Sequence, residues 1–376
     1  MSFLSSLFKK NPLTQAKKQT ELPTSQRNNP NSPTADNTQK TAPAKGYPSS
    51  SGLYPSEAMM LFFAPKFKTT EGRYPDFFRT DFGVGFPKEL FEKLNQTGYI
   101  RPSLSNECLD KLKLADLRVI AADHGIKVGG KKAELIERII QAVSIADLDQ
   151  YHVDRYWVLT EKGQQEKEEN SYLDFFTNDH PYSLKDSGIT FLRLNELHHG
   201  NPTANIRDVI WGELNRLSID TYAQANRNGN FGPYCHVLNT MSSFVEEESR
   251  FLDAIQLFFR YQFYRINFQA GMNAIQYLTY VGTSDAIASA ASSFYMDSKI
   301  YPYEATRIQK LMADNNFDSN QLQKFILDTF SKISDQGFFS NKDLVSFIMS
   351  ELSGNSEIAE ALCVKATKNA KKRIKS

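Results

Sequence analysis

Eight residues between positions 111 and 132 combine positive charge with glycine in a pattern suited to phosphate. They are Lys111, Lys113, Arg118, Lys127, Gly129, Gly130, Lys131 and Lys132. Lysine and arginine bind phosphate without reading base sequence. Glycine lets a backbone come close to a ligand, and a helix that begins at lysines offers N–H groups to an anion. The segment therefore predicts a contact with phosphate groups.

Two short helices are needed to hold these residues. Leu117, Ile120 and Ala121 have helical spacing and predict a helix over 115–124. Gly125 stands where a left-handed helix cap is expected, and an extended connector follows. A second helix is expected from about residue 131. Its inward side chains, with two more from the lead-in, are Leu135, Ile136, Ile139, Val143, Leu112 and Leu114.

Over residues ~107–143, this arrangement resembles the SAP family, a helix–extended–helix module. The matching features include the lead-in Leu112-Lys-Leu114 and the turn Gly125-Ile126. The most specific feature is Gly130-x-Lys132-x-x-Leu135-x-x-Arg138 at the start of the second helix. The resemblance implies binding to DNA, often AT-rich and with little sequence code, or to RNA. It covers about a tenth of the chain, and docking of a protein on the same scaffold stays open as an alternative.

The surplus of positive charge in and beside this segment is modest. It holds eight Lys/Arg, counting Arg155, against six Asp/Glu, counting Glu107. We therefore expect weak binding by the module alone, with help from basic segments elsewhere. Residues 1–52 carry a net charge of +5 and residues 364–376 carry +6, so the total of +1 leaves −10 for the residues between them. Basic ends suit polyanions, but they can also serve only to keep a chain in solution.

Signatures of metal sites and of common enzymes are missing from the sequence. The three cysteines are far apart, which argues against a zinc ribbon or a disulfide framework and fits a reducing cytoplasm. The pairs His198-His199 and Cys235-His236 are adjacent, so their side chains should diverge rather than share a metal. No phosphate-binding loop, dinucleotide motif or nucleophile elbow is present. We expect a cytoplasmic, non-enzymatic protein without cofactor or metal.

The remaining sequence predicts a mainly α-helical, multi-domain chain. Residues 1–52 read as a short amphipathic start followed by a disordered linker, with Phe3, Leu4, Leu7 and Phe8 on one helical face. A small helical region is expected over 53–102, the SAP-like module over 103–145, and a connector with a winged-helix-like strand and turn over 146–170. A helical domain over 171–363 and a basic tail over 364–376 complete the map. In this C-terminal half of the chain, helices are expected at 205–226, 241–266, 303–314, 319–334, 341–352 and 355–372.

These observations favour a nucleic-acid-binding protein that acts mainly on DNA with low sequence specificity. The C-terminal helical domain would recruit a protein partner or self-associate. The alternative is a protein-interaction scaffold or adaptor, tethered to a partner or a membrane surface by residues 1–10. No run of 18 apolar residues occurs in the sequence, so we do not expect a transmembrane helix.

Overall fold

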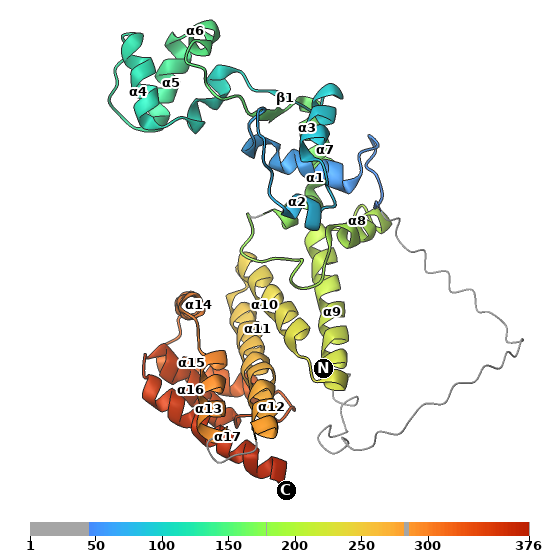
Figure 1. Ribbon diagram of the computed structural model, residues 1–376, viewed down its shortest axis with the longest axis vertical. Coiled ribbons are helices and arrows are strands. Elements are labelled where there is room, and N and C mark those ends of the chain that lie inside the picture. The colour runs from blue at the N-terminus through green and yellow to red at the C-terminus, as the bar shows by residue number, and fades with distance from the viewer. Residues whose placement is uncertain (1–44, 178, 282–285, 376) are drawn as a thin grey trace, which may run out of the picture. The chain divides into compact units, whose positions relative to one another are not determined.

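A computed structural model describes residues 45–177, 179–281 and 286–375 (Figure 1). The fold is mainly α-helical, as predicted. The chain divides into an N-terminal unit that ends at Leu214 and a C-terminal unit that begins at Asn215. Their boundary lies within helix α9 (Ile206–Asn228). The predicted amphipathic start at residues 1–10 and the linker as far as residue 44 lie outside the described residues.

The N-terminal unit contains short helices and one pair of short strands. Up to α9 its elements are α1 (Pro55–Phe63), η1 (Ala64–Lys66), α2 (Phe77–Thr80), α3 (Pro87–Gln96), β1 (Ile100–Pro102), η2 (Ser105–Lys111), α4 (Leu114–Asp123), α5 (Lys132–Ala142), α6 (Ile145–Asp149), β2 (Trp157–Leu159), α7 (Glu161–Glu169), η3 (Ser171–Phe176) and α8 (Phe191–Gly200).

Helix α1 is the centre of this unit outside the SAP-like region. Pro55 occupies its first turn, where a missing N–H costs nothing, and the Tyr54 N–H donates to the Glu57 carboxylate at 2.9 Å. The helix is buried on most sides, since α3, α7, η3 and α8 all pack against it. The predicted domain boundary near residue 170 is therefore not where the units divide, because η3 and α8 complete the core around α1.

Strands β1 and β2 pair antiparallel, with Ile100 opposite Leu159. The whole segment from η2 to α6 is thus an insertion between two paired strands. The predicted strand near residue 156 is present, but the predicted turn after it is wrong. Thr160 caps helix α7 by accepting the Gly163 N–H at 3.1 Å. Gly163 lies so close to the Tyr99 carbonyl that an added Cβ would be 1.9 Å from its oxygen.

Residues 45–53 lie against α7 and α8 rather than continuing the predicted linker to residue 52. The Tyr47 N–H donates to Oδ1 of Asn195 at 2.6 Å, and Nδ2 of Asn195 donates back to the Tyr47 carbonyl at 3.0 Å. The Ser50 N–H and hydroxyl each donate to the Glu169 carboxylate at 2.7 Å. Residues several positions before the expected start of the fold at residue 53 are therefore part of this unit.

The C-terminal unit is a helical assembly built on the long hairpin of α10 and α11. After α9, its elements are α10 (Gly232–Glu247), α11 (Phe251–Tyr264), the π-helical turn η4 (Arg265–Ala270), α12 (Gly271–Val281), α13 (Ala286–Ser298), α14 (Pro302–Asp314), α15 (Ser319–Ser331), α16 (Asn341–Leu352) and α17 (Ser356–Lys375).

The single helix predicted over 241–266 is wrong. The chain breaks at residues 248–250, where Ser249 adopts a positive φ of 60° and the Arg250 N–H donates to the Val245 carbonyl at 3.0 Å. The two resulting helices fold back on each other and bury Phe244, Phe258 and Phe263. The helices predicted at 205–226, 303–314, 319–334 and 341–352 are present as α9, α14, α15 and α16. The segment predicted as a basic tail lies on α17.

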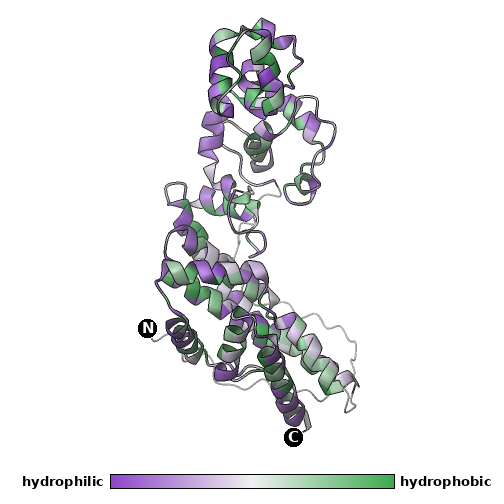
Figure 2. Cartoon of the chain, turned by 90° about the vertical axis from the view of Figure 1, so that its left-hand side faces the viewer, coloured by the Kyte–Doolittle hydropathy of each residue, from purple (hydrophilic) through white to green (hydrophobic). Residues whose placement is uncertain are grey.

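Hydrophilic and hydrophobic residues are mixed along the helices (Figure 2). Within residues 45–177, 179–281 and 286–375, no helix combines the length and apolar character that crossing a bilayer requires.

Candidate nucleic-acid interface

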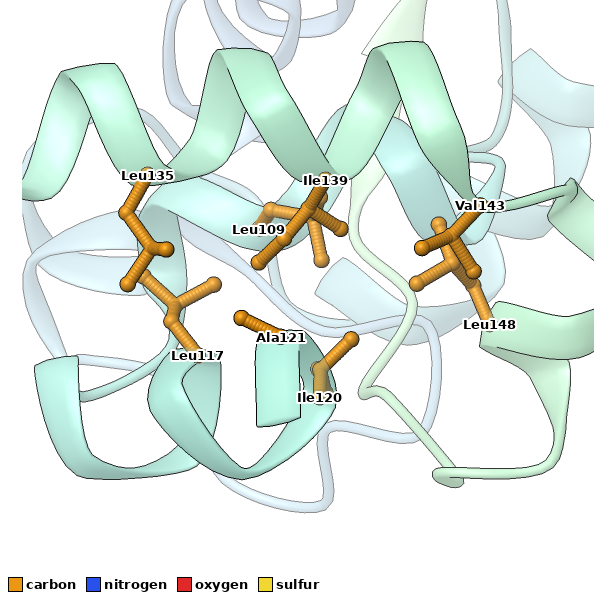
Figure 3. Close-up of a cluster of buried hydrophobic side chains, with 8 residues drawn as sticks. All are labelled: Leu109, Leu117, Ile120, Ala121, Leu135, Ile139, Val143 and Leu148. Atoms are coloured by element: carbon orange, nitrogen blue, oxygen red, sulfur yellow. The ribbon is translucent and has the colours of Figure 1, made fainter. Parts of the chain in front are cut away.

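The inserted segment has its own hydrophobic core. α4 and α5 face each other across it, and their buried side chains point inward between the two helices (Figure 3). Leu109 from η2 and Leu148 from α6 complete the core from outside the helix pair. The other buried members are Leu117, Ile120, Ala121, Leu135, Ile139 and Val143. The helical spacing predicted from the sequence is confirmed for both helices.

Two glycines shape the connection between these helices. Gly125 follows the end of α4 with φ +68, and the Ile126 N–H then donates back to the Ala121 carbonyl at 2.8 Å. Gly130 has φ +107, where a side chain is strained, and a Cβ added there would lie 2.6 Å from Oε2 of Glu134. Gly129 has open space around it. The backbone conformation therefore favours glycine at positions 125 and 130 but not at position 129.

The most specific part of the sequence motif serves the fold. Nζ of Lys132 donates to the Asp110 carbonyl at 2.6 Å, so it ties the start of α5 to the segment leading into α4. Nη2 of Arg138 donates to the Gly129 carbonyl and holds the connector against α5. Leu135 is fully buried. Gly130, Lys132, Leu135 and Arg138 together fix how the two helices meet.

Lysines occupy the N-cap positions of both helices. The Lys113 N–H donates to the Asp116 carboxylate at 3.3 Å, and the Lys131 N–H donates to the Glu134 carboxylate at 3.2 Å. These backbone bonds leave both lysine side chains pointing into solvent. The Glu134 carboxylate already lies at the start of α5, so the helix terminus by itself is a weaker anion site than the sequence predicted.

The candidate cations fall into two groups. In the first group, each side chain has a partner. Lys132 is half-buried and donates to the Asp110 carbonyl, and Nζ of Lys111 lies 3.3 Å from the Asp110 carboxylate. The side chains of the others are exposed and, within the described part of the chain, make no ion pair or hydrogen bond. These are Lys113, Arg118, Lys127 and Lys131.

The link between Lys132 and Asp110 places most of these cations along adjoining segments. Lys111 and Lys113 flank α4 on its lead-in side, and Lys131 begins α5 beside them. Lys127 lies in the connector before Lys131. Arg118 lies on the outward side of α4, and no contact among the described residues joins it to the rest.

A polar cluster at the base of the insertion was not predicted from the sequence. Ser103 is buried, donates its N–H to the Tyr156 carbonyl at 2.7 Å and accepts the Tyr156 N–H on its hydroxyl at 3.0 Å. Arg155 bridges the Ser103 carbonyl and the Asp149 carboxylate at 2.7 and 2.5 Å. The contacts of Ser103 join residues 52 and 53 positions apart and leave no local signal. They hold the insertion on its two-stranded base.

An ion pair reinforces the same base. Arg101 on β1 makes two hydrogen bonds to the Glu107 carboxylate, at 2.7 and 2.8 Å. The Arg101 guanidinium, helped by the Leu104 N–H, lowers the pKa of Glu107 to about 2. Since the pair is partly exposed, its contribution to stability is modest.

The described residues offer little for metal chemistry. Within the described ranges, no group of three or more His, Cys, Asp or Glu side chains could hold a metal ion. The adjacent histidines diverge, as predicted: His199 stacks on Tyr47 with ring centres 3.9 Å apart, whereas His198 faces Tyr172. Burial lowers the pKa of His198.

Comparison with known proteins agrees with this geometry. The family model described as SAP domain matches residues 108–144, which span the end of η2, both helices and the N-cap residue of α6. Searches of curated proteins and of solved structures gave no match. Residues 108–144, a two-helix insertion with lysines at both helix starts, are therefore a SAP domain.

Proposed function

We propose that this protein binds double-stranded DNA through its SAP domain, with low sequence specificity and without catalysing a reaction. The proposal depends on the observation that some basic side chains make bonds within the domain whereas others are exposed. Lys132 and Arg138 are engaged in the fold, whereas the Lys113, Lys127 and Lys131 side chains face solvent with no partner among the described residues. Exposed cations without a structural task are suited to phosphate.

The chemistry of this surface favours backbone contact over base reading. Lysine ammonium groups are compact point charges that bind phosphate without the planar, two-pronged geometry that arginine offers to guanine. Seven basic and five acidic residues in the matched segment leave a surplus of two positive charges. Binding should therefore be weak, strongly dependent on salt and tolerant of sequence. We place the protein in the cytoplasm and assign it no cofactor.

The decisive experiment is a salt titration of duplex binding by the full chain. The variant Lys113→Gln, Lys127→Gln, Lys131→Gln removes three exposed charges and keeps the side-chain stems. Each lost phosphate contact should lower the slope of log K against log salt by about 0.9, so the triple variant should lose about 2 to 3. A matched control, Arg73→Gln with Arg79→Gln and Lys88→Gln, removes three exposed charges elsewhere in the same unit. It should bind as the wild type does.

Lys132 is unsuited to this test, because its ammonium group bonds to the Asp110 carbonyl and its loss would disturb the domain. Wild-type affinity and salt slope in the triple variant would remove the SAP domain from the interface. An equal decrease of the slope in the control variant would show that net charge, rather than the SAP domain, determines binding. Parallel titrations with double-stranded RNA and single-stranded DNA identify the type of nucleic acid, and tighter binding to either would overturn the assignment to duplex DNA.

A further inference from the structure

Helix α17 presents a row of lysines on the side opposite its packing face. Its buried positions repeat at helical spacing and lie against α12 and α13. They are Ala359, Cys363, Ala366, Thr367 and Ala370. Lys365, Lys368 and Lys372 are exposed on another side, three and four residues apart. The helix rises 1.5 Å per residue, so the row is about 10 Å long.

Among the described residues, few negative charges surround this row. Residues 361–375 include no Asp or Glu, α12 has no charged residue, and the one acid of α13 is Asp297 near its C-terminus. Asp343 on α16 accepts a hydrogen bond from Nζ of Lys365 at 2.8 Å. Lys368 and Lys372 have no such counter-ion among the described residues. Within the described part of the chain, no direct ion pair therefore neutralises these two lysines.

The row borders a shallow hollow of about 650 Å³. Lys365, Lys368, Lys371 and Lys372 line it together with Ile287 and Val364. Because α17 is helical through Lys375, the lysines are spaced by a rigid backbone and lose little chain entropy when they bind. A basic tail without fixed structure would lack this arrangement, and the helix predicted over 355–372 is present as α17.

We propose that the lysine row of α17, defined by Lys365, Lys368 and Lys372, is a second contact for the phosphate backbone of DNA. Measured along the axis of a duplex, a length of about 10 Å spans about three phosphates of one strand. A membrane surface fits less well. Helices that lie on bilayers insert a large apolar face, and the apolar face of α17 is buried against its neighbours. The inference rests on the proposed function, since it assigns the same ligand to a second site.

The test uses the full chain and a long mixed-sequence duplex. Lys368→Gln with Lys372→Gln should lower the slope of log K against log salt by about 1 to 2. The control pair Lys324→Gln with Lys332→Gln removes the same charge from α15 and its C-cap in the same unit and should leave the slope unchanged. Both positions of the test pair are exposed, so folding should be preserved, and circular dichroism checks this.

The SAP triple variant, measured beside this pair, separates the two proposals. If the SAP triple variant loses DNA affinity while the α17 pair binds as the wild type does, only this inference is overturned. If the α17 pair loses DNA affinity while the SAP triple variant binds as the wild type does, the proposed SAP interface is overturned and the α17 contact is supported. A third arm uses vesicles of phosphatidylcholine with phosphatidylserine. Vesicle binding that depends on Lys368 and Lys372, without an effect on DNA binding, would assign the row to membranes and refute the proposal.

Discussion

Gly130→Ala offers the sharpest test of how the SAP domain is built. Gly130 has φ +107, and a Cβ there would lie 2.6 Å from Oε2 of Glu134. That carboxylate accepts the Lys131 N–H and so caps α5. Because Glu134 is flexible, it can move aside, but it would then release the capped amide. Alanine therefore introduces backbone strain and also removes a helix cap.

The two costs set the size of the effect. A non-glycine residue in such a backbone conformation costs about 1 to 3 kcal/mol, and loss of a helix cap costs about 1 kcal/mol. The domain should lose about 2 to 4 kcal/mol of stability. At about 1.4 kcal/mol per factor of ten, amide hydrogen exchange in α4 and α5 should become about 30-fold to about 1,000-fold faster. Hydrogen exchange followed by mass spectrometry on the full chain resolves this region separately from the C-terminal unit.

Gly129→Ala is the matched control, one residue away. An added Cβ there meets open space, and its φ lies outside the positive range, so stability should change by less than about 1 kcal/mol. If Gly129 instead permits a close phosphate, this variant loses DNA affinity while exchange stays at the wild-type rate. Wild-type exchange in Gly130→Ala, or equal acceleration in both variants, would refute the reasoning about the backbone.

Three further predictions concern other parts of the chain. Because its pKa is lowered in the folded state, Glu107 stabilises the base of the SAP domain above its unfolded pKa, and this contribution is lost as pH falls from about 4.5 towards about 2. Glu107→Gln should thus flatten the pH dependence of local exchange in this window. Phe263→Ala, at a fully buried site in the C-terminal unit, should cost about 3 to 5 kcal/mol in thermal unfolding, whereas Leu252→Ala, which is 55% exposed, should cost less than about 0.5 kcal/mol. Under the rival scaffold hypothesis, deletion of residues 1–10 abolishes recovery of the protein with anionic vesicles; unchanged recovery would eliminate that tether.

Within the SAP domain, much of the local structure was predictable from the sequence. The apolar side chains that meet between α4 and α5 repeat at helical spacing, and each helix forms by contacts within a few residues. Gly125 was predicted as a turn because only glycine adopts positive φ at little cost. The same reasoning assigned Gly129 and Lys132 to ligand binding. The structure gives Lys132 an internal bond, which involves a residue 22 positions away and has no local signal.

Elements without a periodic or breaker signal were missed or misjudged. The break between α10 and α11 occurs at Ser249, which is neither glycine nor proline, so the sequence read as one helix. Helices α12 and α13 were not predicted, since small residues such as Ala290 and Ala291 weaken the apolar pattern even where they are fully packed. In both cases packing between helices overrides local preference.

The sequence by itself determined the SAP helices, their turn and the supply of basic residues, because helical period, glycine backbone freedom and charge are local properties. Only the tertiary structure decided which cations are available. It placed Lys132 and Arg138 in the fold, left Lys113 and Lys131 in solvent, and buried the face of α17 opposite its lysines. It also inserted the domain between β1 and β2. The physical reason is that these outcomes depend on contacts between residues far apart in the chain, whose partners no local pattern specifies.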